Sequence, residues 1–171
     1  MISPDYWEDY LHPIPEQERD NLLLAYHQRL TGSNELAKMA CAKAWSLWEA
    51  HCATLRPSVD MIDAFSDPHR ALSLSRIEAH YFMQGSFLLE NQILDNARAL
   101  EGIPGIIVHG RYDMICPLDT AQALHHVWHD SQLHIIREAG HASREPSIVD
   151  ALVRATRTMA RRFSDAAPSR A

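Results

Sequence analysis

Apolar residues recur about every 3.6 positions from Pro15 to Leu100, a spacing that is typical of amphipathic helices. The pattern predicts helices at 15–30, 34–55, 68–81 and 91–100. The first of them begins with a proline and acidic residues and ends before the Thr-Gly-Ser-Asn run at 31–34, which combines a helix stop with a new N-cap. This part of the chain is therefore expected to be helical.

From Gly102 onward, short runs rich in β-branched residues alternate with amphipathic segments. The runs predict strands at 104–110 and 131–138, and the segments predict helices at 117–129 and 147–163. A helical connection of this length suits two parallel strands, and such connections are almost always right-handed. The sequence therefore predicts an α/β protein, with a mostly helical domain at 1–101 followed by a βαβα unit with parallel strands at 102–171.

Two polar residues follow the predicted strands at their carboxyl ends. Asp113 comes just after the first strand, in the run IIVHGRYDMICP, and His141 comes just after the second, in EAGHASREP. Chemistry gathers at this edge of open α/β sheets, where neighbouring strands lie about 4.8 Å apart. The two side chains are therefore expected to approach hydrogen-bond distance. A carboxylate that holds the Nδ1–H of a histidine leaves Nε2 free to take a proton from a nucleophile.

The residues alone leave other interpretations open. Asp113 at a strand end also suits a turn former or a helix cap, and His141 is one of eleven histidines. His125 and His129 have the i, i+4 spacing of a metal site, but they lack the accompanying glutamate and a third ligand, which favours a polar helix surface. Surface or packing roles are also favoured for His126, for the pair Trp45 and Trp48, and for Cys116.

Composition narrows the class of protein. The 171 residues are 46% hydrophobic and 22% charged, which describes one ordinary globular domain or a piece of a larger one. A net charge of −6 provides no basic surface for nucleic acid. No apolar run reaches the ~20 residues that span a bilayer, and no signal peptide is recognisable, so a cytoplasmic protein is expected. The three cysteines follow no disulfide or metal spacing.

Several motifs carry a family resemblance. The runs IPGIIVHGRYDMICP, EAGHASREP and IVDALVRAT closely resemble the C-terminal region of bacterial prolyl aminopeptidases (proline iminopeptidases), which are serine peptidases with the α/β-hydrolase fold. The runs YWEDYLHPIPEQER, AWSLWE and RIEAHYF resemble the helical cap of the same family. The resemblance covers residues from about 4 to 163. It implies a partial α/β-hydrolase, in which the cap is followed by the C-terminal part of the core.

The resemblance implies roles for four residues. Asp113 of the GRYD motif matches the acid of a catalytic triad, and His141 of the AGH motif matches its general base. Glu49, which ends the W-x-x-W-E motif, and Glu78, in R-I-E-x-H-Y-F, match cap glutamates that bind the free amino group of an N-terminal proline. Paired carboxylates suit a secondary ammonium in a closed pocket. Peptides with N-terminal proline are the implied substrates, and no metal or organic cofactor is implied.

The nucleophile of this family has no counterpart in the chain. Its serine lies in a G-x-S-x-G turn between a strand and a helix, and no such motif occurs here. Ser86, the nearest imitation, lacks the second glycine and a preceding β-rich run, and the oxyanion loop is missing as well. The chain is therefore expected to begin inside the full-length pattern, to be inactive alone, and to need a separately encoded N-terminal half or to self-associate. The alternative is a non-catalytic remnant of a split or truncated hydrolase that acts as a binding module.

Overall fold

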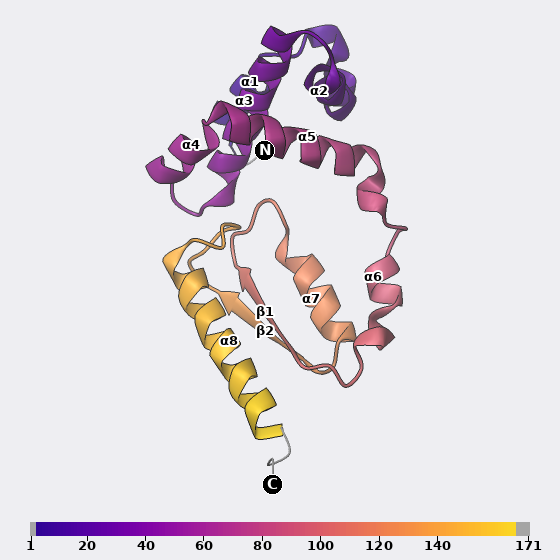
Figure 1. Ribbon diagram of the computed structural model, residues 1–171, viewed down its shortest axis with the longest axis vertical. Coiled ribbons are helices and arrows are strands. Elements are labelled where there is room, and N and C mark those ends of the chain that lie inside the picture. Colours follow the sequence, from indigo (N-terminus) through magenta and orange to yellow (C-terminus); the bar gives the residue numbers. More distant parts are fainter. Residues whose placement is uncertain (1–2, 167–171) are drawn as a thin grey trace. The chain divides into compact units, whose positions relative to one another are not determined.

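The computed structural model describes residues 3–166, which form two compact units of different secondary structure (Figure 1). The helical unit holds the residues up to Cys52 together with Arg56–Glu90. The α/β unit holds Ala53–Leu55 together with the residues from Asn91 onward. Among the described residues, no helix is both long enough and apolar enough to cross a membrane.

The helical unit is built from α-helices and short 3₁₀ turns. Their bounds are α1 Pro4–Leu11, η1 Glu16–Asn21, α2 Leu22–Thr31, α3 Glu35–Ala53, α4 Val59–Phe65, α5 Pro68–Met83 and η2 Gly85–Phe87. The helices predicted at 34–55 and 68–81 are confirmed as α3 and α5. The prediction of one helix at 15–30 is wrong, because the Asn21 side chain accepts the Leu24 N–H at 3.1 Å and starts a new helix after the 3₁₀ turn.

The apolar pattern does not predict α1 and α4, because both are too short to show a clear period. α1 begins with Pro4 at its first position. Proline suits this position because an N–H there would have no acceptor within the helix. α4 is seven residues long and follows a segment that reads as a helix stop. The hydroxyl of Ser58 accepts the Met61 N–H at 3.3 Å, so a polar N-cap starts this helix although the apolar pattern does not indicate one.

Aromatic residues and alanines form the core of the helical unit. Tyr26 of α2 is fully buried and packs edge-on against Trp45 of α3, with the ring centroids 5.4 Å apart. The Tyr26 hydroxyl donates to the carbonyl oxygen of Tyr10 in α1. Ala71 and Ala79 lie in the same buried cluster, and their small side chains let α5 pack closely on α2. This packing holds α3 and α5, the helices that carry Glu49 and Glu78.

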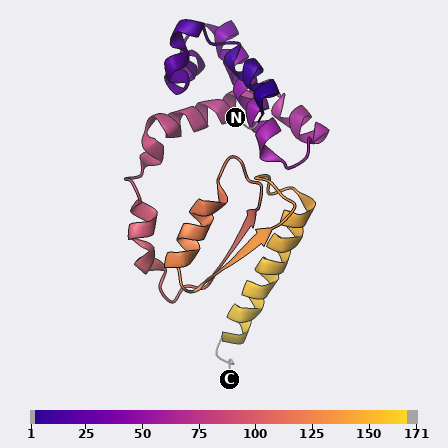
Figure 2. The same cartoon turned by 180° about the vertical axis from the view of Figure 1, so that it is seen from behind.

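The α/β unit alternates strands and helices. Its elements are α6 Gln92–Asp95, η3 Ala97–Leu100, β1 Gly105–Gly110, α7 Leu118–Val127, β2 Ser131–Ile136 and α8 Pro146–Ala166. β1 and β2 pair in parallel, from Gly105 opposite Ser131 to Gly110 opposite Ile136. Both strands contact α7 and α8, which lie on opposite sides of the sheet (Figures 1 and 2). The predicted strand–helix–strand–helix order and the parallel pairing are confirmed.

The prediction of one helix at 91–100 is wrong. The backbone of Asn96 leaves the helical region, with φ −103° and ψ 11°, and separates α6 from the 3₁₀ turn η3. The Asn96 side-chain amide donates to the Gln92 carbonyl oxygen at 2.7 Å. Asparagine competes in this way with the backbone hydrogen bonds of a helix, which explains why the apolar pattern overestimates the length of the helix.

The end of β1 lies directly against the loop that joins β2 to α8. A Cβ atom on Gly110 would lie 1.9 Å from the Gly140 carbonyl oxygen, so only glycine fits at this position. Beyond the strands, the N–H groups of Arg111 and Tyr112 donate to the carbonyl oxygens of Ile136 and Ala139, each at 2.9 Å. These backbone contacts carry the two chain segments side by side past the ends of the strands.

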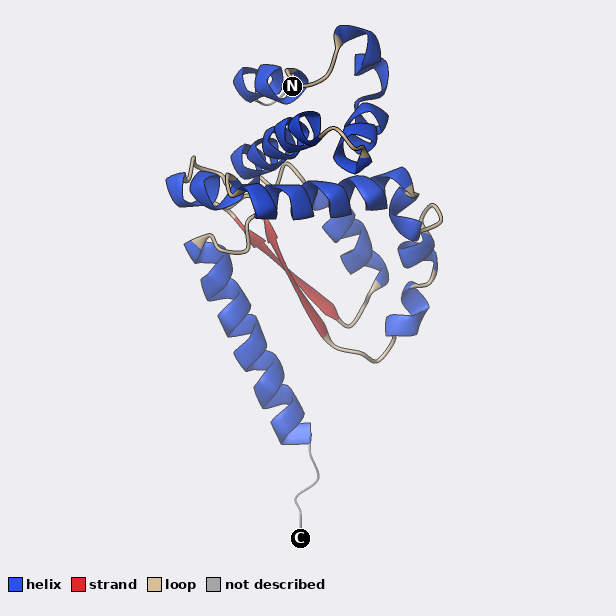
Figure 3. Ribbon diagram, turned by 45° about the horizontal axis from the view of Figure 1, so that its top comes forward, coloured by secondary structure: helices blue, strands red, loops and turns tan. Residues whose placement is uncertain are grey.

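The small sheet leaves apolar surface uncovered. Figure 3 shows the two strands in red, and within residues 3–166 neither strand has a second neighbour. α8 buries Ile148, Ala151 and Ala155 but exposes Val149, Leu152, Val153 and Phe163. Because parallel strands normally lie inside larger sheets that are covered on both faces, the α/β unit presents an incomplete sheet and an unpaired apolar helix face.

Candidate active site

Asp113 and His141 lie together just past the carboxyl ends of β1 and β2. The Nδ1 atom of His141 lies 3.1 Å from the Oδ2 atom of Asp113. The Asp113 side chain is 6% exposed, whereas the His141 side chain is 39% exposed. Since a carboxylate oxygen only accepts, Nδ1 carries the proton in this hydrogen bond. The ring is therefore held by a buried acid on one side and presents its Nε2 edge on the other.

The second oxygen of Asp113 organises the turn after β1. Oδ1 accepts the N–H groups of Ile115 at 3.0 Å and of Cys116 at 2.8 Å. Asp113 is thus a turn former and a histidine partner at the same time, with one carboxylate oxygen for each contact. These backbone donors satisfy the buried carboxylate and restrict its rotation.

A second histidine lies beside this carboxylate. The Nε2 atom of His109 in β1 lies 2.9 Å from the Cys116 carbonyl oxygen and 3.6 Å from Asp113 Oδ2. The sequence prediction did not include His109. Its only signal in the sequence is a polar residue in the otherwise apolar run IIVHG.

Glu145 holds the loop that carries His141. Its Oε1 accepts the Gly140 N–H at 2.6 Å, and its Oε2 accepts the Leu55 N–H at 3.4 Å. In the same region the Ala142 N–H donates to the Ala53 carbonyl oxygen at 2.7 Å. The sequence prediction also missed Glu145, whose signal is a glutamate at the start of α8 that is placed to bind exposed N–H groups. The residues on both sides of His141 are therefore tied to a chain segment far away in the sequence.

The two glutamates implied by the family resemblance lie in the helical unit, Glu49 on α3 and Glu78 on α5. Burial, together with a smaller contribution from the negative charge of Glu78, raises the pKa of Glu49 from its ordinary value of 4.5 to about 7. The indole Nε1–H of Trp45 donates to Glu78 Oε2 at 2.6 Å. Burial and the charges of these two glutamates also raise the pKa of Tyr10. Two like charges thus share a partly desolvated site with aromatic walls, which suits the binding of a cation.

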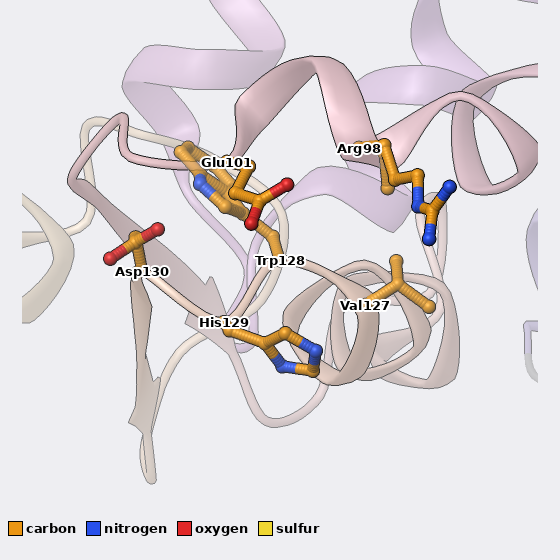
Figure 4. Close-up of a pocket in the computed structure, with 7 residues that line it drawn as sticks. Arg98, Glu101, Val127, Trp128, His129 and Asp130 are labelled. Atoms are coloured by element: carbon orange, nitrogen blue, oxygen red, sulfur yellow. The ribbon is translucent and has the colours of Figure 1, made fainter.

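The cavity drawn in Figure 4 lies at the wrong end of the sheet for the Asp113–His141 pair. It has a volume of about 230 Å³, and Arg98, Glu101 and Asp130 are among the residues that line it. Asp130 directly precedes β2, whereas His141 follows that strand. Because a strand rises about 3.3 Å per residue, the six residues of β2 separate the cavity from the pair by roughly 15–20 Å. The cavity is therefore not a substrate pocket for the pair.

A second cavity lies in the helical unit. It has a volume of about 410 Å³ and is lined by residues of α1 and α3 that include Tyr6, Leu47 and His51. At about 100° per residue, Leu47 and His51 lie on the opposite side of α3 from Glu49. Neither Glu49 nor Glu78 lines this cavity, although Tyr10, whose pKa their charges raise, does.

The other candidates of the sequence analysis have structural environments of their own. His125 Nδ1 lies 2.7 Å from the Ser131 hydroxyl, and no group of metal-binding side chains occurs in the described part of the chain. Cys116 is exposed, and Trp45 is a core residue. Ser86 follows helix α5 rather than a strand and lies in the turn η2. Of these residues, only Cys116 takes part in the Asp113–His141 arrangement, through its backbone N–H and carbonyl groups.

The α/β unit, with an acid and a histidine beyond the ends of two parallel strands, is part of an α/β-hydrolase fold, as predicted. No family model matches the chain. Among curated proteins, the chain is 49% identical over 156 residues to the proline iminopeptidase of Xanthomonas citri. The match covers 91% of this chain and 50% of that protein. It is 40% identical over 160 residues to the proline iminopeptidase of Arabidopsis thaliana. This match covers 92% of this chain and 42% of that protein.

These similarities confirm the resemblance read from the motifs. The chain is related to the proline iminopeptidases, a family of hydrolases, over nearly all of its own length. It spans about half the length of the curated relatives that it matches.

Proposed function

We propose that this chain supplies the acid–base pair and the amino-group site of a serine aminopeptidase that releases N-terminal proline from peptides. The hydrogen bond between Asp113 Oδ2 and His141 Nδ1 is the observation that carries this proposal. The names of the relatives supply the substrate class. In this proposal the nucleophilic serine and the oxyanion-binding groups lie outside these 171 residues, in an N-terminal half of the enzyme.

The proposed chemistry of the pair follows from its geometry. With Nδ1–H held by Asp113, the His141 ring offers Nε2 to the hydroxyl of a serine that lies outside these 171 residues. Nε2 takes the hydroxyl proton as the serine attacks the amide carbonyl, and it returns the proton to the departing amine. Asp113 stabilises the imidazolium that exists between these two steps. The backbone N–H groups on its other oxygen hold the acid in place.

The proposed recognition of the substrate uses Glu49 and Glu78. A carboxylate pair in a partly desolvated site is costly while both groups are ionised, and a bound ammonium removes that cost. An N-terminal proline provides a secondary ammonium fixed in a ring, which loses little conformational entropy on binding. We propose that these two glutamates select peptides with a free N-terminal proline.

Complementation tests the proposal directly. The chain is mixed with the half of the Xanthomonas citri enzyme that it does not match, and release of the chromophore from a chromogenic proline amide is followed. Hydrolysis is expected only in the mixture. His141→Ala and Asp113→Ala are expected to lower it by at least about 10³-fold, since the triad acts as one unit. His126→Ala, which alters an exposed histidine of α7, is the matched control and should leave the rate unchanged. A mixture that stays inactive, or one in which His141→Ala keeps its rate, contradicts the proposal.

The chain alone is expected not to turn over the proline amide, because it holds no G-x-S-x-G nucleophile. Measurable turnover that Ser86→Ala abolishes would overturn this expectation. We also propose that the isolated chain self-associates through its incomplete sheet and the apolar face of α8. Analytical ultracentrifugation that finds a compact monomer at all concentrations would contradict self-association.

A second candidate function is a binding module without catalysis. It is favoured by the position of Glu49 and Glu78, which lie within the helical unit and need no residue of the α/β unit. Calorimetric binding of proline amide to the chain, combined with failure of complementation, would select this function. We also propose that the protein is cytoplasmic. Cell fractionation with an antibody against the chain would test this location.

A further inference from the structure

His109 contacts the turn that holds Asp113, and its Nε2 atom also lies 3.6 Å from Asp113 Oδ2. Its Nε2 atom lies 2.9 Å from the Cys116 carbonyl oxygen. A carbonyl oxygen only accepts, so Nε2 carries a proton in this contact. The His109 side chain is 13% exposed and stands on β1, whose backbone is paired with β2. A side chain on a paired strand is a firmer support than one on a loop.

Two contacts hold the backbone of Cys116 on either side of its Cα atom. Asp113 Oδ1 binds the N–H of Cys116 at 2.8 Å, and His109 binds the carbonyl oxygen of the same residue. If the hydrogen bond from His109 is lost, Cys116 can rotate, and its N–H moves away from Oδ1. The carboxylate then turns more freely, and Oδ2 is no longer fixed at His141 Nδ1.

We propose that His109 is a positioning residue for the Asp113–His141 pair. It holds the turn 113–116 so that Asp113 keeps one oxygen on the backbone and directs the other to His141. His109 acts through Cys116 and Asp113 and does not touch the substrate. This inference rests on the proposed function, because the pair matters only if Asp113 and His141 act as acid and base.

Three substitutions at His109 test the role of its Nε2–H. His109→Leu removes the donor and keeps a similar volume. His109→Asn keeps a polar amide but is too short to place a donor where Nε2 lies. His109→Gln places an amide N–H near that position and should rescue the wild-type behaviour. His125→Leu is the matched control, since His125 is a half-buried histidine of the same unit that hydrogen-bonds Ser131 instead.

Two NMR measurements on the complete chain report the effect without any need for turnover. Amide hydrogen exchange follows Ile115 and Cys116, and ¹⁵N spectra of the histidine rings report which nitrogen of His141 carries the proton. We expect His109→Leu and His109→Asn to speed exchange at both amides about tenfold, the equilibrium effect of one lost hydrogen bond. We also expect His141 to change from the Nδ1–H tautomer to a mixture of tautomers. His109→Gln and His125→Leu should stay within about twofold of wild type.

The outcomes separate the two proposals. If His109→Leu and His109→Asn leave the His141 tautomer and both exchange rates unchanged, His109 has no positioning role. If His109→Leu does not fold, the comparison of His109→Asn with His109→Gln decides, because a purely structural histidine would not give rescue by glutamine alone. If wild-type His141 shows no Nδ1–H tautomer, or Asp113→Ala does not alter it, the proposed acid–base pair itself fails, whatever the His109 variants do.

Discussion

The two units hold their carboxylates in opposite ways. In the α/β unit, the Asp113 carboxylate accepts hydrogen bonds from two backbone N–H groups and from the Nδ1–H of His141. In the helical unit, Glu49 is half-buried near a second carboxylate, Glu78, and its pKa is raised to about 7. Hydrogen-bond donors contact the first carboxylate, whereas burial and a like charge disfavour the charged form of the second.

This difference indicates different tasks. A satisfied, immobile carboxylate suits an acid that must hold and orient a histidine throughout a reaction. Two carboxylates close together in a partly desolvated site disfavour each other's charge, which suits the binding of a cation. The same carboxylate chemistry thus has different surroundings in the two units, and the different roles proposed for Asp113 and Glu49 rest on that difference.

The substitution with the largest expected effect tests whether the two units unfold independently. Gly110→Ala places a Cβ atom 1.9 Å from the Gly140 carbonyl oxygen, and both are backbone positions that cannot move aside easily. We expect a loss of about 3 kcal/mol of stability in the α/β unit. Labelling with 5-fluorotryptophan separates the units, because Trp128 lies in the α/β unit and Trp7, Trp45 and Trp48 lie in the helical unit.

The ¹⁹F resonance of Trp128 should shift to its unfolded position in Gly110→Ala, while the other three resonances keep their native positions. Gly102→Ala is the control, since a Cβ atom at Gly102 meets nothing within 4 Å and only its φ of +75° disfavours alanine. Its cost should be about 1 kcal/mol. Joint loss of all four resonances in Gly110→Ala would show that the two units unfold together, which would contradict their independence.

The next effect concerns Glu49. A raised pKa means that the folded chain holds this proton more tightly than the unfolded chain does between pH 4.5 and about 7. The free energy of unfolding therefore falls as the pH rises through this range and stays low above it. Glu49→Gln removes this penalty and should stabilise the helical unit at pH 8 by on the order of 2 kcal/mol, with the difference closing toward pH 4.

Guanidinium unfolding at pH 4, 6 and 8, followed through the ¹⁹F resonances of the helical unit, measures this effect. Glu35→Gln is the matched control, because Glu35 is an exposed glutamate of the same helix. Added proline amide should stabilise wild type at pH 8 and should have little effect on Glu49→Gln. Equal pH dependence in wild type and Glu49→Gln would remove the contrast with Asp113.

The smallest effect concerns the loop of His141. Glu145→Ala removes the acceptor for the N–H groups of Gly140 and Leu55 and should cost the α/β unit about 1.5 kcal/mol. Glu145→Gln keeps one acceptor oxygen and should cost less. Thermal unfolding and exchange of the Gly140 amide measure the change, with the exposed Glu138→Ala as control. If Glu138→Ala costs as much as Glu145→Ala, the loop is not held by these contacts.

Long, regular elements could be predicted from the sequence, and short or capped ones could not. The periods in α3, α5 and α8 and the two β-rich runs gave the right element types, because their burial repeats along the chain. The breaks at Asn21 and Asn96 were missed because each depends on a single side chain that competes for backbone hydrogen bonds. Local competition of this kind leaves no trace in an apolar pattern.

The sequence by itself determined the two strand ends at which Asp113 and His141 lie, and its motifs determined the relationship to proline iminopeptidases. Only the tertiary structure decided which atoms meet: Asp113 Oδ2 with His141 Nδ1, His109 with Cys116, and Glu145 with Leu55. The physical reason is that period and composition depend on neighbours along the chain. Hydrogen bonds and desolvation depend on neighbours in space, and those exist only once the strands have paired and the helices have packed.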